Sequence, residues 1–140
     1  MAKGSNGTGA AASLPPAIVV AKAMTAPTEL RVSKDRKLLT ITFPAHQPVE
    51  LSAELLRVAS PSAEVQGHSP AQRVTVPGKR NVAIADMVPT GNYAVRIVFD
   101  DGHATGIFTW DYLHRMAHDK ATMWQSYLDE LAAKGLSRDR

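Results

Sequence analysis

Hydrophobic and polar residues alternate in several short segments of this chain, each bounded by turn-forming residues. Leu39, Ile41 and Phe43 alternate with threonines, a pattern typical of a strand with one buried face. Residues 33–37 are polar and separate this segment from a shorter apolar one at residues 30–32, which predicts an antiparallel hairpin. Pro44 ends its second strand.

A short helix is predicted to start at Ser52. The Ser52 hydroxyl can cap the helix, while Leu51 and Leu56 are spaced to form a hydrophobic staple across its first turn. Pro61 ends the helix, because the residue before a proline is pushed out of the helical region. Residues 62–80 are rich in turn formers and predict a loop with a short strand around 74–76.

Three further strands are predicted between residues 82 and 109. The first covers residues 82–88, and residues 89–92 form the turn after it. In the second, residues 93–99, alternation places Tyr93, Val95, Ile97 and Phe99 on one face and Arg96 on the other. The pair 101–102 (Asp-Gly) indicates a type I′ hairpin turn into the third, residues 104–109.

The C-terminal part is predicted to be helical. One apolar stripe is formed by Leu113, Met116 and Ala117, and a second by Trp124, Tyr127, Leu128 and Leu131. We expect a break between two helices at residues 119–120 and a stop at Gly135. The second stripe fits packing on the sheet or pairing in a homodimer. The expected fold is α+β: a small, mostly antiparallel sheet of hairpins, a short helix after the second strand and C-terminal helices.

The expected organisation is one domain with two flanking segments. Residues 1–27 are rich in Gly, Ala, Ser, Thr and Pro and contain no aromatic residue, which predicts a disordered leader. Residues 28–118 form the domain, and residues 119–140 form a C-terminal helical extension. A length of 140 residues with 44% hydrophobic content is sufficient for one core.

Composition narrows the chemistry. The formal net charge is +3, but the basic residues are scattered, so no nucleic-acid partner is expected. No apolar run is long enough for a membrane span or a secretory signal, so we expect no membrane partner and a cytoplasmic location. The chain has no cysteine, which excludes disulfides, thiolate zinc ligands and cysteine nucleophiles.

The motif search yields no coherent set of acid, base and nucleophile. His114 and His118 are four residues apart and could chelate together, but the glutamate of a zincin motif does not lie between them. No Gly-x-Ser-x-Gly elbow occurs. We therefore expect a protein that is not an enzyme and that needs no cofactor.

One group of polar residues remains as a candidate binding surface. It combines a helix-to-loop segment with the predicted hairpin turn, and charged loop residues are frequent at functional surfaces. Its members are Arg57, Glu64, His68, Asp101, His103 and Trp110. The alternative is a structural role, in which Arg57 and Glu64 form an ion pair and a backbone carbonyl satisfies His103.

Several motifs, in order, carry a resemblance to a known family. They are LLRVASPSAE at residues 55–64 with GH at 67–68, GNYAVR at 91–96, FDDGH at 99–103 and GIFTWDYL at 106–113. With them the chain resembles, over residues 28–118, the gamma-butyrobetaine hydroxylase-like N-terminal domain family, a bacterial domain of unknown function. In gamma-butyrobetaine and trimethyllysine hydroxylases, a similar domain precedes a separate iron and 2-oxoglutarate catalytic domain.

The resemblance also implies a zinc site that this chain has lost. In the hydroxylases the similar domain binds a structural zinc through three cysteines and one histidine. Ser60, Ser62 and Val65 stand at the cysteine positions, and His103 stands at the histidine position. Hydroxyl groups and a valine cannot replace thiolates, so no bound zinc is expected. Similar domains are also fused to Mrp-type ATPases that carry Fe–S clusters, which implies an accessory role.

The sequence therefore favours a non-catalytic accessory or protein-interaction module linked to Fe–S or oxygenase-related metabolism, with an unknown protein partner. This hypothesis expects an exposed surface around Arg57, Glu64, His68 and His103, without a deep pocket. The alternative is a small metal- or ligand-binding domain that uses His68 and His103 with nearby carboxylates. Both a monomer and a homodimer are compatible with the sequence.

Overall fold

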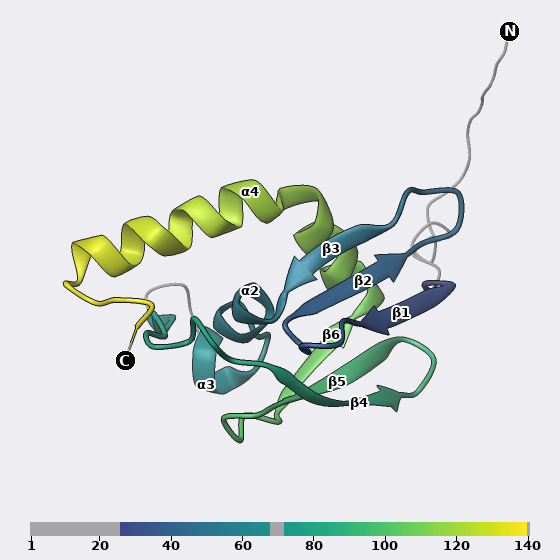
Figure 1. Cartoon of the computed structure of the whole chain (residues 1–140), viewed down its shortest axis with the longest axis horizontal. Coiled ribbons are helices and arrows are strands. Elements are labelled where there is room, and N and C mark those ends of the chain that lie inside the picture. Colours follow the sequence, from purple (N-terminus) through teal and green to yellow (C-terminus); the bar gives the residue numbers. More distant parts are fainter. Residues whose placement is uncertain (1–25, 68–71, 140) are drawn as a thin grey trace, which may run out of the picture.

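In the described part of the chain, the fold consists of two three-stranded antiparallel sheets, three helices and a C-terminal tail (Figure 1). The computed structural model describes residues 26–67 and 72–139. The elements are β1 (Glu29–Val32), β2 (Leu38–Thr42), β3 (Val49–Ser52), α2 (Ala53–Val58), α3 (Ala63–Gln66), β4 (Ile84–Thr90), β5 (Ala94–Phe99), β6 (Gly106–Thr109) and α4 (Trp110–Ala133). The predicted α+β class is confirmed. The hairpins form two sheets rather than one, and the short helix follows the third strand rather than the second.

The first sheet has the order β1-β2-β3 and contains the predicted hairpin. Leu39 and Ile41 of β2 are fully buried, as the alternation predicts, and Leu39 faces Leu51 of β3 across the ladder. The sequence prediction missed β3 because this strand has only four residues and follows a proline-containing segment without alternation.

The short helix α2 begins where the capping pattern predicts. The Ser52 side chain accepts a hydrogen bond from the Leu55 amide at 3.0 Å. After Pro61, the four-residue helix α3 lies in the segment that was predicted to be loop. A single helical turn has no period to detect, which explains the omission. The strand expected at residues 74–76 is wrong: this segment is extended but belongs to no sheet, although the Val74 amide donates to the Val65 carbonyl at 2.7 Å.

The second sheet has the order β4-β5-β6. Val95, Ile97 and Phe99 of β5 are buried on one face, as predicted, whereas Tyr93 precedes the strand and is exposed. Two residues that were assigned to a turn, Pro89 and Thr90, belong to β4 instead. A register shift in β4 between residues 84 and 86 marks a bulge near its start.

A single 24-residue helix, α4, replaces the two helices expected at the C-terminus. Leu113, Met116, Tyr127 and Leu131 are buried, so helical periodicity continues through residues 119–120. The predicted break is therefore wrong. Within the described part of the chain, no helix is long and apolar enough to cross a membrane.

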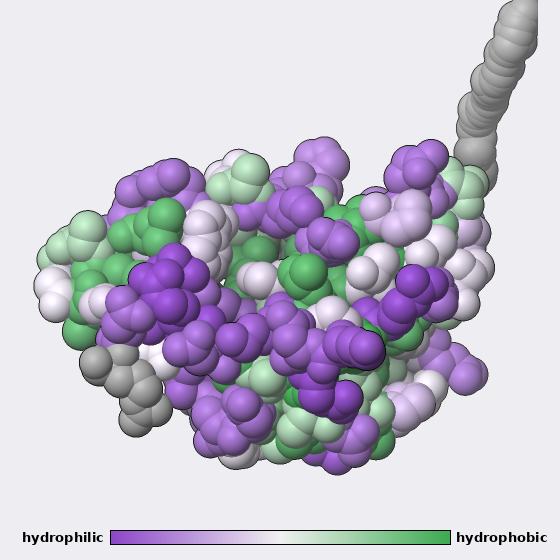
Figure 2. Space-filling model, in the orientation of Figure 1, coloured by the Kyte–Doolittle hydropathy of each residue, from purple (hydrophilic) through white to green (hydrophobic). Residues whose placement is uncertain are grey.

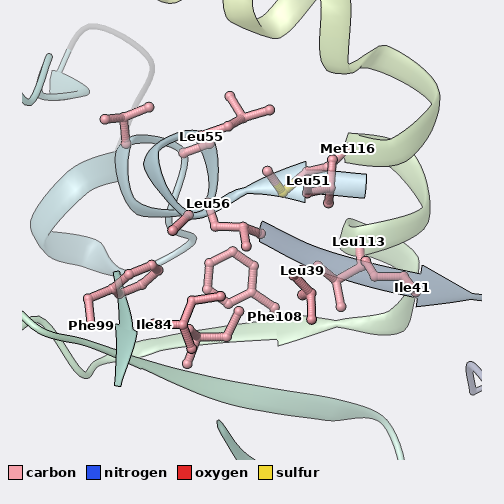
Figure 3. Packing of buried hydrophobic residues seen from close by; sticks show 14 of the residues in the cluster. Leu39, Ile41, Leu51, Leu55, Leu56, Ile84, Phe99, Phe108, Leu113 and Met116 are labelled. Atoms are coloured by element: carbon pink, nitrogen blue, oxygen red, sulfur yellow. The ribbon is translucent and has the colours of Figure 1, made fainter. Parts of the chain in front are cut away.

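The hydrophobic core lies between the two sheets, α2 and α4. Figure 3 shows the side chains of both sheets and of these helices converging there. Its largest fully buried members include Phe99, Phe108, Leu39, Ile41, Leu51, Leu56, Ile84, Ile97, Leu113 and Met116. On the face drawn in Figure 2, hydrophilic residues cover most of the surface, and hydrophobic residues emerge between them, among other places along α4.

The chain after α4 folds back against α2 and the segment before β4. The Ser137 carbonyl accepts a hydrogen bond from Gly78, and the Arg138 carbonyl accepts one from Arg80. The Arg138 guanidinium donates to both carboxylate oxygens of Glu54, at 2.7 and 2.8 Å, and lies over the Trp124 ring. Glu54 is buried, so this pair of hydrogen bonds from Arg138 offsets the cost of removing its carboxylate from water.

The replacement Arg138→Ala should therefore lower the free energy of unfolding by about 2–4 kcal/mol at neutral pH, because it leaves the Glu54 carboxylate buried without a partner. The paired replacement Glu54→Gln with Arg138→Met should recover most of this loss. Urea unfolding of the three proteins measures it. Arg31→Ala, which removes an exposed ion pair with Glu29, is the matched control and should change stability by less than about 0.5 kcal/mol. A stability loss at Arg138 no larger than that of the control would contradict the interpretation.

Candidate functional site

The loop between β5 and β6 carries the central residues of the candidate site. The type I′ turn predicted for it is wrong, because only Gly102 has a positive φ, of 92°, and Asp101 does not. The Gly102 amide donates to the Phe99 carbonyl, and the Phe99 amide donates to the His103 carbonyl. These bonds are typical of a three-residue loop that ends in a left-handed glycine. The loop thereby turns the Asp101 and His103 side chains toward the helices.

Asp101 connects three segments that are far apart in the sequence. Its carboxylate accepts a hydrogen bond from Arg57 Nε at 2.8 Å and one from Lys79 Nζ at 2.6 Å, and it also accepts the His103 amide at 3.0 Å. We call Asp101, Arg57 and Lys79 the Asp101 cluster. Burial raises the pKa of Asp101, but the hydrogen bonds from Lys79, the His103 amide and Arg57 outweigh this effect and hold that pKa far below its ordinary value. The carboxylate is therefore ionised throughout the physiological range.

His103 is buried between the start of β6 and the α2–α3 connection. Its Nε2 lies 3.0 Å from Ser60 Oγ and 3.3 Å from Ser62 Oγ, and its Nδ1 lies 3.1 Å from Glu64 Oε1. Burial and the positive charge of Arg57 lower the pKa of His103, although the Glu64 carboxylate opposes this shift. The neutral tautomer with the proton on Nδ1 fits these contacts, because Nδ1–H donates to Glu64 and the single lone pair of Nε2 accepts from a serine hydroxyl, of which Ser60 is the nearer.

Close packing fixes the α2–α3 connection against β6. Ser60 has no exposed surface, and a Cβ added to Gly106 would approach Ser60 Oγ to 2.2 Å, so only glycine fits at that position. Gln66 Nε2 donates to the Ser60 carbonyl at 2.9 Å, and the Tyr112 hydroxyl of α4 donates to the Ala59 carbonyl at 2.5 Å. Helix α4 thus helps to hold the residues that surround His103.

Ser60, His103 and Glu64 have the spacing of a hydrolytic triad, in which a serine, a histidine and a carboxylate follow one another by hydrogen bonds. A nucleophile must reach its substrate, however, and the Ser60 side chain is completely enclosed. The geometry is better suited to ordering the loop than to attacking a substrate.

A cavity of about 450 Å³ opens beside this network, and we call it the His103 cavity. Its apolar wall is made by Val65, Val74 and Val76, and its polar wall is made by Arg57, Glu64, His103 and Thr105. Glu64 lies at the rim, where Thr105 Oγ1 donates to it at 2.8 Å. One nitrogen of Arg57, Nη1, is buried and has no hydrogen-bond partner among the described residues.

A second cavity, of about 360 Å³, lies between α2 and α4 and is mainly apolar. The hydroxyls of its two tyrosines, Tyr112 and Tyr127, donate to backbone carbonyls, those of Ala59 and Val76. Burial, with a smaller contribution from the Glu54 carboxylate, raises the pKa of Tyr127 to about 12. These groups hold α4 in place, and none of the residues selected from the sequence lines this cavity.

The structure brings together four of the six residues that the sequence analysis selected, namely Arg57, Glu64, Asp101 and His103. His68 lies outside the described residues. Trp110 lies at the opposite end of β6 from His103, where its Nε1 donates to the Asn92 carbonyl. His114, considered above as a metal ligand, packs instead against the Phe43 ring at 5.1 Å.

Two details of the sequence prediction are wrong. The Arg57–Glu64 pair of the alternative structural interpretation does not form, because Arg57 binds Asp101 and Glu64 binds His103. The expected exposure is wrong for Arg57 and His103, which are largely buried, whereas Glu64 is exposed as expected. Sequence reasoning missed Lys79 and Thr105. Thr105 follows His103 by two residues in an extended segment, which was a usable signal, whereas no local pattern indicates Lys79.

The fold and this network define a small α+β domain in which a hairpin loop docks onto a pair of short helices. The family model described as "Gamma-butyrobetaine hydroxylase-like, N-terminal" matches residues 30–114. The chain therefore belongs to this family, as the motifs of the sequence indicated.

Several solved structures are similar to the chain over most of its length. One NMR solution structure is 47% identical, with a TM-score of 0.73, and the match covers 84% of this chain and 92% of that one. A second NMR structure is 41% identical, with a TM-score of 0.72 and coverage of 90% and 91%. A crystal structure of a DUF971-family protein from Acidithiobacillus ferrooxidans ATCC 23270 is 36% identical, with a TM-score of 0.55 and coverage of 67% and 94%. No protein with a curated description matches.

The four positions that the family resemblance assigns to zinc can be tested for their chemistry. Ser60, Ser62 and His103 lie within hydrogen-bond distance of one another, and Val65 lines the cavity beside them. One imidazole, two hydroxyls and an isopropyl group do not fit zinc, which binds thiolate, imidazole and carboxylate ligands. In residues 26–67 and 72–139, no group of three or more His, Cys, Asp or Glu side chains is arranged for a metal ion.

His103 should titrate below pH 6.5 in NMR pH titrations, because burial and Arg57 disfavour the imidazolium form. The neutral form is thus stabilised by folding, and this contribution is lost as the pH falls from 6.5 through the lower, folded-state pKa. The variant Glu64→Gln should lower the midpoint further. Nitrogen chemical shifts at pH 7 should show the proton on Nδ1. A midpoint above 6.5, or a rise in Glu64→Gln, would show that the environment is misassigned.

The triple variant Ser60→Cys, Ser62→Cys and Val65→Cys should bind about one zinc ion per chain, because these replacements supply three thiolates beside His103. Elemental analysis after gel filtration, with the wild-type chain in parallel, measures the gain. Adding His103→Ala to the triple variant is the control and should weaken zinc binding by about tenfold or more. Equal zinc binding with and without His103 would refute the positional correspondence.

Proposed function

We propose that this domain is a non-catalytic interaction module, and that another protein docks on the surface around the His103 cavity. The observation that supports the proposal is the rigid wall of this cavity. The Asp101 cluster ties α2, residue 79 and the β5–β6 loop together, and His103 joins the same loop to α3. Binding sites gain affinity when their walls are fixed in advance, because less ordering is needed on association.

The energetics of buried charge support a functional role as well. Arg57 and Asp101 have only 12% and 17% of their side-chain surfaces exposed. A buried ion pair is often no more stabilising than apolar residues of the same volume, because desolvation opposes the Coulombic attraction. Stability alone therefore gives little reason to place charges here, whereas a precisely placed loop and a cationic wall are useful for recognition.

The accessible part of the site has the composition of an interface. Val74 is 47% exposed and continues the apolar wall of Val65 and Val76 to the surface. Glu64 and Thr105 form a polar rim beside it. An apolar centre with a polar rim is the usual arrangement of protein–protein interfaces.

The partner is sought first among oxygenases, because the family description names a hydroxylase. Iron–sulfur proteins come next, because the family resemblance extends to domains fused to Mrp-type ATPases. The alternative function, a metal- or ligand-binding domain that uses His68 and His103 with nearby carboxylates, has less support. Both ring nitrogens of His103 already have protein partners, so a ligand would have to displace Glu64 or the serines.

Site-specific photo-crosslinking in cells tests the proposal. A photoreactive amino acid at Val74 should capture a discrete protein, and the same group at Ile107, which is 40% exposed elsewhere on the second sheet, should not. In the second arm, an untagged competitor chain carries the replacement. A Val74→Glu competitor should no longer bind the partner and should leave the crosslink intact, whereas an Ile107→Glu competitor should suppress the crosslink as the wild-type chain does. Circular dichroism checks that both variants fold. No specific product at position 74, or equal products at both positions, would overturn the proposal.

A further inference from the structure

The Arg57 guanidinium has one nitrogen for which residues 26–67 and 72–139 supply no hydrogen-bond partner. Its Nε donates to Asp101, whereas Nη1 is buried and, within the described residues, meets no acceptor. A buried charged donor without an acceptor is costly, and native proteins rarely contain one. The edge that carries Nη1 is therefore suited to an oxygen atom that the described residues do not supply.

Arg57 also lines the His103 cavity, so its buried Nη1 belongs to a side chain that shares this cavity with the valine wall. Val65, Val74 and Val76 form an aliphatic surface opposite the polar groups of the β5–β6 loop. A cavity of about 450 Å³ falls within the usual range for sites that hold a small molecule or a few side chains. A ligand that complements both Arg57 and the valine wall therefore carries an anionic oxygen and a branched aliphatic group close together.

The charges around the cavity favour an anion next to Arg57. In the Asp101 cluster, one carboxylate is shared by two cations, which leaves one positive charge in excess. Among the described residues that line the cavity, the acidic one is Glu64, but 64% of its side chain is exposed and its carboxylate is engaged by Thr105 and His103. Water screens an exposed charge more strongly than a buried one, so the Arg57 side determines the preference.

We propose that the His103 cavity receives the C-terminus of a partner protein, with the terminal carboxylate on Arg57 and an aliphatic last side chain against the three valines. This inference rests on the proposed function and adds which part of the partner binds. A C-terminal residue carries its carboxylate and its side chain on the same carbon atom, whereas an Asp or Glu side chain carries no branched aliphatic group. Capture of terminal carboxylates is a known mode of peptide recognition. Arg57 itself stays bound to Asp101, so contact with the buried Nη1 requires the side chains that cover it to change rotamer, as interface side chains commonly do on binding.

Methyl and arginine NMR signals of the whole chain provide the test. The probes are the tripeptides acetyl-Gly-Gly-Val and acetyl-Gly-Gly-Leu, each as the free acid and as the C-terminal amide. The free acids should shift the Arg57 Nε–H signal and the methyl signals of Val65, Val74 and Val76. They should bind about tenfold or more tightly than the amides, since a hydrogen bond to a charged group is lost in the amides. Equal binding of acid and amide would overturn the inference.

Two variants locate the binding. Arg57→Lys keeps a cation for Asp101 but loses the free guanidinium edge, so it should reduce the preference for acid over amide by about tenfold. Val74→Glu places a negative charge on the exposed wall and should abolish binding, while Ile107→Glu is the matched control and should bind normally. If Arg57→Lys does not fold, the comparison of Val74→Glu with Ile107→Glu decides whether the tripeptides bind in the His103 cavity. Binding that survives Val74→Glu would contradict the site.

Isovalerate, a free small carboxylate, separates the two sources of this chemistry. It should bind about tenfold or more weakly than the tripeptide acids, because it lacks the peptide that precedes the terminus. Isovalerate binding as tightly as the tripeptides would replace the proposed partner with a small metabolite and overturn the inference. If no carboxylate binds while crosslinking at Val74 still captures a protein, the inference fails and the proposed function stands. If both experiments are negative, both proposals fail.

Discussion

The ion pairs of Asp101 hold together three parts of the molecule that share no local sequence signal. Arg57 comes from the end of α2, Lys79 from the segment before β4, and Asp101 itself from the β5–β6 loop. Taking these charges out of water is costly, and their mutual attraction offsets that cost only while all partners remain. The position of His103 depends on the same carboxylate, because Asp101 also accepts the His103 amide. The geometry of the candidate site is therefore set by one carboxylate.

Helix α4 and the tail form a second support on the other side of α2. Two tyrosines of α4 donate to backbone carbonyls near the site. One carbonyl is that of Ala59, at the end of α2, and the other is that of Val76, which lines the His103 cavity. Arg138 of the tail pairs with the buried Glu54 in the first turn of α2. The C-terminal region thus acts on the site indirectly, by fixing the helix and the valine-bearing segment that line it.

Local patterns predicted the elements whose periodicity is visible in a few residues. Alternation identified β2, and the Ser52 cap identified the start of α2. The same reasoning missed β3 and α3, which are too short to show a period, and it divided α4 at residues 119–120 because charged side chains interrupt the stripe on the exposed side. The loop of Asp101 was located, but its turn type was not, since neighbouring helices and strands select the backbone conformation.

For the candidate site, the sequence identified the participants better than their partners. Arg57, Glu64, Asp101 and His103 were selected because they lie in loops and match the motifs of the family. Their pairing is a tertiary property, and nothing in the spacing indicates that Arg57 binds Asp101 rather than Glu64. Lys79 has no local signal at all. The buried position of His103 depends on the small side chains of Ser60 and Gly106, which become informative only when the fold is known.

The unfolding free energy of the variant Asp101→Asn between pH 7 and pH 2.5 is the most direct measurement of this dependence. The account predicts that the variant is less stable than the wild-type chain by about 2–3 kcal/mol at pH 7, since Arg57 and Lys79 lose their shared partner. The folded-state pKa of Asp101 lies below its ordinary value of 3.8, so its contribution is complete above that pH and is lost as the pH falls below it. The two stability curves should therefore converge in acid. Equal stability at pH 7, or a gap that does not narrow below pH 3.8, would contradict the central role of Asp101.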